Sequence, residues 1–223
     1  MPNWVATNLY IRGKKEDLQK VKENLLVTDE WRKEVAERNA KVTPKMVVNG
    51  KAIGTKKVKD FRIKCNEDDY PLGTLDFNRI VPTPLNIFQG NIGIKERKRY
   101  GDENCWLDWC MANWGTKWNT TENMAEDIDE ETIFVRFWVA NVFPKALMEE
   151  FNKRCLEYNC TIDGEFADED LGGTMGIFHS EDEGLYLTFA DCDTELYNNV
   201  WHDDECEPIM GYDTIVSRSV KVR

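Results

Sequence analysis

Two strand–helix units constrain the fold of this chain more than any other feature. The first begins with "WVATNLYIRG" (4–13), which is rich in β-branched and aromatic residues and stops at Gly13, as is typical of a strand. The segment "KKEDLQKVKENLL" (14–26) then places an apolar stripe at helical spacing, formed by Leu18, Val21, Leu25 and Leu26. A strand followed by an amphipathic helix indicates an α+β or α/β protein.

The second unit begins with "TIFVRFWVA" (132–140), which is apolar on nearly both faces and predicts a buried strand. Pro144 can open the next helix, predicted over 145–158, because the first helical turn tolerates proline. Three more strand candidates follow, at 160–168, 172–180 and 184–193. This order predicts one α+β domain over 1–223, with an antiparallel or mixed sheet and helices mainly on one face.

The chain between the two units is different in character. Residues 27–64 are interpreted as a basic insertion, in which Asn49-Gly50 predicts a hairpin that continues as a strand after residue 54. The segment 75–84 is expected to be extended and to end at its two prolines, which cannot donate to a ladder. Residues 121–131 are expected to form an acidic connection, and 195–223 a C-terminal extension.

An aromatic helix is predicted just before the heptapeptide "NWGTKWN" (113–119). Its apolar face is formed by Trp106, Trp109, Cys110 and Asn113, which recur at i, i+3, i+4 and i+7. We expect a cap near Asp102 and an end at Gly115, which would adopt a left-handed conformation. The heptapeptide is therefore the end of a helix and the loop that leaves it.

Two interpretations of this loop stay open. It could be a recognition platform, in which the indoles of Trp114 and Trp118 stack a ring and Lys117 meets an anion. It could equally be a packed corner, with both indoles against the sheet beside Trp106 and Trp138 and with Asn119 bonded to loop backbone. The corner is favoured, because indoles rarely face water without a role. Residues that could complete a cleft beside Lys117 come from the segment 75–84: Asp76, Asn78 and Arg79.

Three stretches resemble a known family. "MPNW" at the start, "LDFNRIVPTP" (75–84) and "WLDWCMANWGTKWN" (106–119) are similar in order and spacing to the YubB/Api92-like proteins, and the Gly-Gly strand at 172–178 is similar to that family's closing hairpin. The resemblance implies a ferredoxin-like domain and an origin in phages, plasmids or integrated elements. It implies no reaction and no catalytic residues. The basic hairpin at 41–64 departs from the family's shorter pattern.

The charge is distributed unevenly along the chain. The net charge is −12, but residues 1–64 carry 16 Lys/Arg against 8 Asp/Glu, and the stretch 155–217 has no Lys or Arg and 17 acids. The two halves could neutralise one another, which is the favoured interpretation, or the acidic third could form a face that repels nucleic acid and attracts a basic partner. Nucleic acid is therefore an unlikely partner except through the basic hairpin at 41–64.

Cysteine and histidine usage argues against cofactor or metal chemistry. The seven cysteines form no C-x-x-C pair and there are only two histidines, which favours reduced, buried thiols. His202 lies among acids in "WHDDEC" (201–206), but without the register of a known cation loop. The sequence has no apolar stretch of the ~18 residues that a membrane helix needs, and no secretory signal, so a cytoplasmic protein without membrane partners is expected.

The sequence thus leads to a hypothesis of a non-enzymatic binding protein of a mobile genetic element. In the leading version, an acidic C-terminal face engages a basic host protein. The alternatives are a sensor or sequestering protein that holds a nucleotide-like ligand in the tryptophan-rich corner, and a metal-dependent enzyme. No catalytic residue, cofactor or metal ligand is assigned, and the oligomeric state is not predicted.

Overall fold

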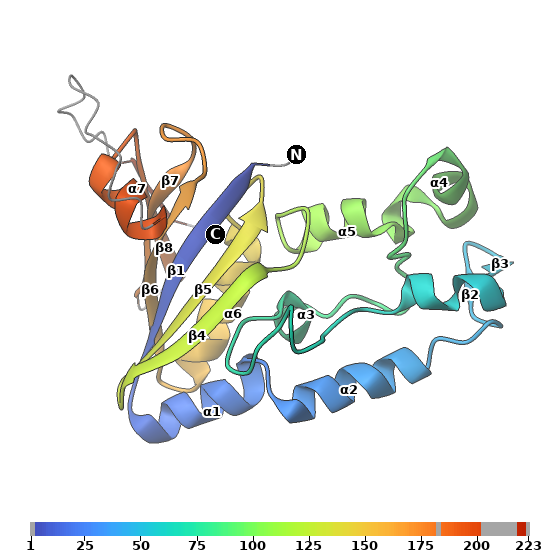
Figure 1. The fold of residues 1–223 in the computed structure, drawn as a ribbon, viewed down its shortest axis with the longest axis horizontal. Helices are drawn as coiled ribbons and strands as arrows, with labels where there is room; N and C mark the ends of the chain where they lie inside the picture. Colours follow the sequence, from blue (N-terminus) through green and yellow to red (C-terminus); the bar gives the residue numbers. More distant parts are fainter. Residues whose placement is uncertain (1–2, 182–183, 202–217, 222–223) are drawn as a thin grey trace.

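A computed structural model describes residues 3–181, 184–201 and 218–221. Its centre is one seven-stranded sheet in the order β4-β5-β1-β6-β7-β8-β9, in which every neighbouring pair is antiparallel (Figure 1). A separate two-stranded ladder joins β2 to β3. The predicted α+β class and antiparallel sheet are confirmed.

Six elements form a ferredoxin-like core. They are β1 (Trp4–Arg12), α1 (Lys15–Leu25), β4 (Thr121–Asp129), β5 (Thr132–Ala140), α6 (Lys145–Glu157) and β6 (Thr161–Asp168). Each helix connects two parallel strands that have one antiparallel strand between them, which gives the spatial order β4-β5-β1-β6. The two strand–helix units seen in the sequence are the two halves of this core.

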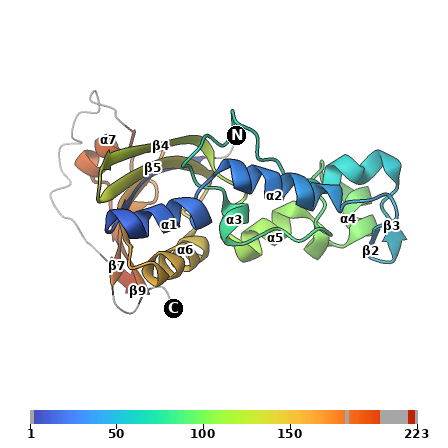
Figure 2. The same ribbon diagram turned by 90° about the horizontal axis from the view of Figure 1, so that it is seen from below.

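Three more strands extend the sheet beyond β6, and one helix covers part of its second face. These elements are β7 (Met175–Glu181), β8 (Gly184–Ala190), α7 (Thr194–Trp201) and β9 (Arg218–Lys221). Figure 2 shows α1 and α6 on one side of the sheet and α7 on the other. The sheet therefore has seven strands rather than the four of the minimal ferredoxin-like pattern.

Strand alternation divides the sheet into an inner and an outer face. Val5, Leu9 and Ile11 of β1 point to α1 and α6, where they join Phe151 and other apolar residues in the main hydrophobic core. The alternate residues of β1 point to the outer face, where α7 packs over Ala6 with Leu196, Tyr197 and Val200. Because successive side chains point to opposite faces, one strand supplies both surfaces.

The chain between α1 and β4 forms an arm that projects from one end of the sheet (Figures 1 and 2). Its elements are α2 (Asp29–Ala40), β2 (Val47–Val48), β3 (Lys51–Ala52), a 3₁₀ helix (Thr55–Phe61), α3 (Phe77–Ile80), α4 (Ile94–Tyr100), a 3₁₀ turn (Asp102–Asn104) and α5 (Trp106–Asn113). The arm contains two small apolar clusters of its own, one around Phe61, Phe88 and Tyr100 and one around Trp31 and Tyr70. The insertion expected at 27–64 is the first part of this arm.

The hairpin at Asn49-Gly50 is confirmed, with both residues at positive φ (48° and 71°). Three other local predictions in this part of the chain are wrong. Residues 55–61 form a 3₁₀ helix instead of a strand. Residues 77–80 form a helical turn instead of an extended segment, because the Asp76 side chain accepts from the Asn78 backbone N–H and caps it.

The third wrong prediction is the acidic connection at 121–131, most of which is the edge strand β4. Charged side chains are common on edge strands, where they prevent pairing with another chain, so acidity there does not indicate a loop. The aromatic helix begins at Trp106 rather than near Asp102, whose carboxylate instead accepts from Arg97 at 2.7 Å.

The described cysteines are all free thiols, and four of them are buried: Cys105, Cys110, Cys155 and Cys160. This agrees with the predicted reduced state. None of the helices in the described part of the chain is long and apolar enough to cross a membrane.

Candidate functional site

The loop after α5 is a packed corner at Trp114. Gly115 has φ +77°, as expected for the residue that ends a helix with a left-handed turn. Trp114 is only 3% exposed, its indole N–H donates to the Val81 carbonyl at 2.9 Å, and it meets the rings of Phe77 and Trp109 edge-on. Trp114 therefore fixes the loop against the main core and is too buried to stack a ligand.

A buried polar network lies beneath the corner. Asp76 is fully buried and accepts hydrogen bonds from the Asn119 amide at 2.7 Å, the Trp31 indole at 2.9 Å and the Asn78 backbone at 2.9 Å. Asn119 in turn accepts from the backbone N–H of Phe77 at 2.9 Å. These bonds compensate the carboxylate for the loss of water and join the loop after α5 to α2 and α3.

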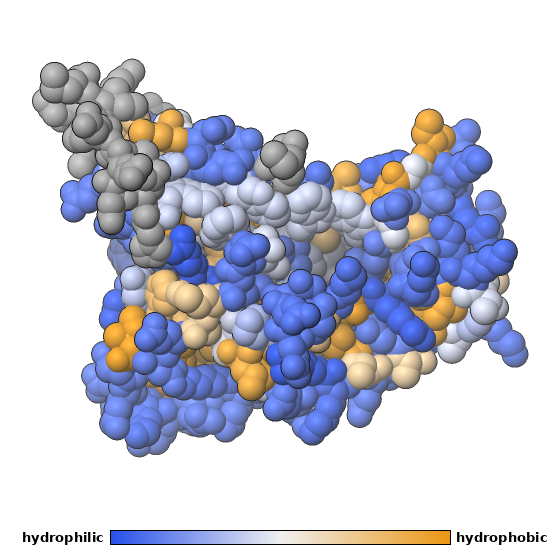
Figure 3. Space-filling view, viewed as in Figure 1, coloured by the Kyte–Doolittle hydropathy of each residue, from blue (hydrophilic) through white to orange (hydrophobic). Residues whose placement is uncertain are grey.

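Trp118 is more exposed than Trp114. It is half-buried and lies between Trp106, at 6.4 Å between ring centroids, and Trp4, at 5.8 Å. Contacts from Trp4 to Trp138 and from Trp138 to Trp201 extend the series, so that five half-buried indoles form a tryptophan row. In Figure 3 the row appears as a pale band that crosses the molecule between α7 and α5.

A pocket of about 690 Å³ opens at the α5 end of this row. We call it the corner pocket. One wall is aromatic and is formed by Trp106, Trp114 and Trp118. The other wall comes from the arm and is basic, because Lys59, Arg62 and Lys64 line it, while Lys117 lies 4.5 Å above the Trp118 ring.

The four cations of the corner pocket form no ion pair with any residue that the structure describes, although Asp60 also lines the pocket. Lys59, Arg62 and Lys64 are exposed, and Lys117 is half-buried. Unpaired cations beside aromatic faces can hold a ligand that combines a flat ring with negative charge. Phosphate and carboxylate groups are the anions that arginine and lysine bind best.

The groups at the back of the corner pocket do not point to covalent chemistry. Burial raises the pKa of the Cys110 thiol to about 12, so it stays protonated at neutral pH and is a poor nucleophile. The pKa of Tyr70 is also raised well above its ordinary value, mainly by burial and then by the charge of Asp76. Neither Cys110 nor Tyr70 is therefore deprotonated and available as a nucleophile or general base at neutral pH.

The structure brings five of the seven predicted site residues to the corner pocket: Asn78, Trp114, Lys117, Trp118 and Asn119. Asp76 lies buried behind them. Arg79 points away from the pocket, donates to the Asn24 carbonyl at the end of α1 and lies 5.5 Å from the Trp31 ring centroid.

The sequence did not predict the basic wall as part of this site. The segment 41–64 is recognisably rich in lysine and arginine, but Lys59, Arg62 and Lys64 are more than 50 residues from Lys117 and Trp118 along the chain. Only the folding of the arm brings them together. His179 is exposed on β7, where its Nε2 lies 3.0 Å from the Glu181 carboxylate. Residues 202–206 of "WHDDEC" lie outside the described residues.

Comparison with known proteins gives one distant likeness. No family model and no curated protein sequence matches the chain. A similar solved structure is the crystal structure of a protein api92 from Yersinia pseudotuberculosis, which is 11% identical, with a TM-score of 0.46 over 81% of this chain and 95% of that chain. The family resemblance seen in the sequence is supported only as a distant likeness of this kind, and no functional residue follows from it.

Proposed function

We propose that the protein binds a phosphorylated aromatic compound of the nucleotide type in the corner pocket. The observation that supports this most directly is the juxtaposition of half-buried Trp106 and Trp118 with unpaired Lys59, Arg62 and Lys64 around one hollow. Such a pocket offers a stacking surface for a base and positive charge for its phosphates. A role without catalysis, as a sensor or sequestering protein, fits the buried and protonated state of Cys110.

The tryptophans of the row allow a direct measurement of binding. A nucleotide stacked on Trp118 should quench indole fluorescence, and Trp118→Ala should weaken binding roughly tenfold or more, because base–aromatic stacking contributes about 1–3 kcal/mol. Trp118 is a better position for this test than Trp114, because replacing Trp114 would leave a cavity in the core and destabilise the fold.

The basic wall gives an independent arm of the same test. Arg62→Ala should weaken binding of a nucleoside triphosphate about tenfold but leave nucleoside binding nearly unchanged, because only the phosphates contact the cation. Lys153→Ala is the control, since Lys153 is exposed on α6 and does not line the corner pocket. The proposal is wrong if no nucleotide alters the fluorescence, or if Lys153→Ala weakens binding as much as Arg62→Ala.

A second candidate function is the binding of a basic protein by the acidic C-terminal third. One observation favours it: in the described part of the chain, no ion pair joins a lysine or arginine of 41–64 to an acid of 155–201, and the arm projects from the end of the sheet opposite α7 (Figure 1). Of these acids, only Asp163 forms an ion pair with a described lysine or arginine, namely Arg12, so close contacts leave most of their charge unpaired. An origin in a phage, plasmid or integrated element is part of this proposal and rests on the sequence resemblance alone.

The test is a salt-dependent pull-down with a variant that keeps the side-chain shapes and removes the charges. A true partner should be retained at low ionic strength, released at high ionic strength and lost when the exposed residues Glu169, Asp191 and Glu195 are changed to amides. Retention by this triple variant would exclude the acidic face as the binding surface.

A further inference from the structure

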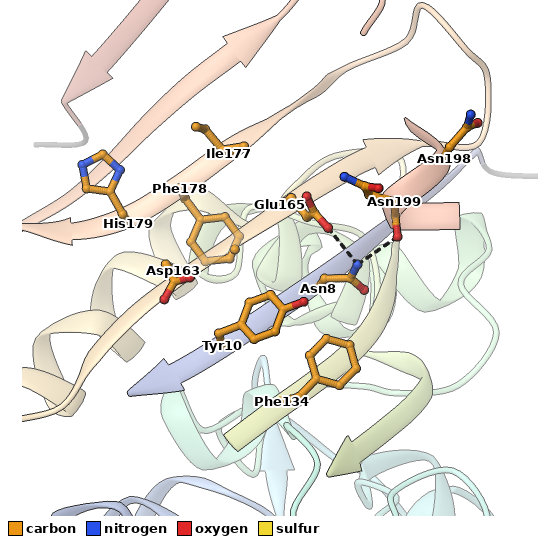
Figure 4. Close-up of a pocket in the computed structure, with 11 residues that line it drawn as sticks. Asn8, Tyr10, Phe134, Asp163, Glu165, Ile177, Phe178, His179, Asn198 and Asn199 are labelled. Atoms are coloured by element: carbon orange, nitrogen blue, oxygen red, sulfur yellow. Dashed lines mark hydrogen bonds between the residues drawn. The ribbon is translucent and has the colours of Figure 1, made fainter. Parts of the chain in front are cut away.

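A second pocket lies on the outer face of the sheet, away from the corner pocket. It has a volume of about 700 Å³ and lies beside the C-terminal half of α7, from which Asn198 and Asn199 reach its edge (Figure 4). We call it the sheet-face pocket. Its floor is formed by outward-pointing residues of the central strands, namely Asn8, Tyr10, Phe134, Asp163 and Glu165.

Asn8 is the most unusual residue of the sheet-face pocket. It is 2% exposed, and its amide nitrogen donates to the Glu165 carboxylate at 3.1 Å and to the Asn199 carbonyl at 3.3 Å (Figure 4). Its side-chain oxygen has no hydrogen-bond partner. A buried acceptor without a donor is costly, and natural proteins usually fill such a position with a ligand, an ion or water.

The carboxylates around Asn8 favour a positively charged hydrogen-bond donor as the ligand. Asp163 and Glu165 line the pocket, and of its described lining residues none is a lysine or arginine. The arginines of β1 and β5 are already engaged: Arg12 donates to Asp163 at 2.6 Å, and Arg136 donates to the Val200 carbonyl at 2.7 Å. Glu165 forms no ion pair with a described residue, so its negative charge remains available.

Aromatic faces complete the sheet-face pocket. The rings of Tyr10 and Phe134 lie 5.2 Å apart between centroids, at an angle of 43°, and both are half-buried. Burial, followed by the charges of Glu165 and Asp163, raises the pKa of Tyr10, which is consistent with a negative local potential. Aromatic faces beside carboxylates attract cations that carry several N–H donors.

We infer that the sheet-face pocket binds an organic cation of the guanidinium or alkylammonium type. The cation would donate to the Asn8 side-chain oxygen and to Glu165 and would lie against Phe134. This chemistry could come from the arginine or lysine side chain of a protein or from a free amine. The inference is independent of nucleotide binding, since the two pockets share no residue.

Calorimetric titration of the full chain with arginine amide tests the inference, with citrulline amide as the uncharged probe of the same shape. Both probes are acetylated at the α-nitrogen, so that the guanidinium is the only charge of the first and the second has none. Arginine amide should bind and citrulline amide should not. Glu165→Gln, which keeps an acceptor for the Asn8 amide but removes the charge, should weaken binding about 10- to 100-fold, the range expected for a hydrogen bond to a charged group. Phe134→Leu should weaken it about 3- to 30-fold.

Glu157→Gln is the matched control, because Glu157 is exposed on α6 across the sheet and loses the same charge. An arginine-containing peptide and spermidine then distinguish the sources: tighter binding of the peptide than of either small cation identifies a protein side chain, and equal or weaker binding identifies a free amine. The inference would be overturned if neither arginine amide nor spermidine binds, if citrulline amide binds as tightly as arginine amide, or if Glu165→Gln leaves the affinity for arginine amide unchanged.

Discussion

At the scale of single residues, the corner depends on Asp76 more than on its tryptophans. A fully buried carboxylate is stable only when donors replace its water, and here the donors come from Trp31, Asn78 and Asn119, on three different segments. The favoured interpretation of the loop has Asn119 bonded to loop backbone, and its side-chain oxygen accepts from the Thr120 N–H at 2.9 Å as well as from the Phe77 N–H. The sequence could not predict the partners of Asp76, because two of them are more than 40 residues away along the chain and depend on the folding of the arm.

Asp76→Ala should lower the free energy of unfolding by about 3–5 kcal/mol, because four donor groups on three residues would lose their acceptor at once. Chemical denaturation monitored by circular dichroism measures this difference. Asp127→Ala is the control, since Asp127 is exposed and meets only Lys22 on the surface, and a change within about 0.5 kcal/mol is expected. A loss for Asp76→Ala no larger than that of the control would show that the network is not structural.

At the scale of elements, the helices and strands that could be predicted from the sequence are those with a clear apolar periodicity. β1, α1, β5 and α6 have one strong apolar pattern each, and their existence and order followed from the sequence. β4 was missed because most of its side chains are exposed, so the segment has no apolar pattern. Its acidic residues suggested a loop, although charged side chains are also common on edge strands. α3 was missed because a single turn has no periodicity, and its cap at Asp76 is the only local signal.

Gly164 lies opposite Leu9 in the middle of the β1–β6 ladder. A methyl group there would come within 2.1 Å of the Asn8 carbonyl oxygen and 2.6 Å of the Phe178 ring, so backbone would have to move. Gly164→Ala should therefore destabilise the fold by about 2–3 kcal/mol and lower the melting temperature. Gly93→Ala is the control, because its nearest neighbour is the flexible Glu96 carboxylate at 3.2 Å. Equal melting temperatures for the two variants would contradict this account.

At the scale of the whole molecule, the main core is separate from the smaller apolar clusters of the arm. The main core joins α1, α6 and the inner face of the sheet, whereas the far end of the arm is held by a small cluster around Phe61, Phe88 and Tyr100. In the basic wall of the corner pocket, Lys59 and Arg62 flank Phe61 of this cluster, whereas Lys64 follows Ile63 of the cluster around Trp31 and Tyr70. The sequence indicated an insertion but not where it would lie, since composition alone does not specify which surface a distant segment meets.

Phe61→Ala should loosen the arm without unfolding the sheet. Phe61 is fully buried against Phe88 and Tyr100, with centroids 5.5 and 5.3 Å away, and its loss should cost the arm about 3–5 kcal/mol. Hydrogen exchange should accelerate in residues 42–61 and 88–105 and stay slow in β1 and β5, while nucleotide binding at the corner pocket falls. Phe151→Ala, in the main core, should instead accelerate exchange throughout. Uniform acceleration in both variants would mean that the arm and the sheet unfold together.

The position of the arm between α1 and β4 also affects how the chain folds during synthesis. β1 pairs with β5 and β6 over more than 120 residues of sequence, and it has no strand partner before β5. Until the ribosome has made residues 132–140, both edges of β1 remain without a strand partner. Contacts between residues so far apart in the sequence also form slowly. The arm is complete before then, so its small cluster can fold first and shorten the effective loop that the first strand has to close.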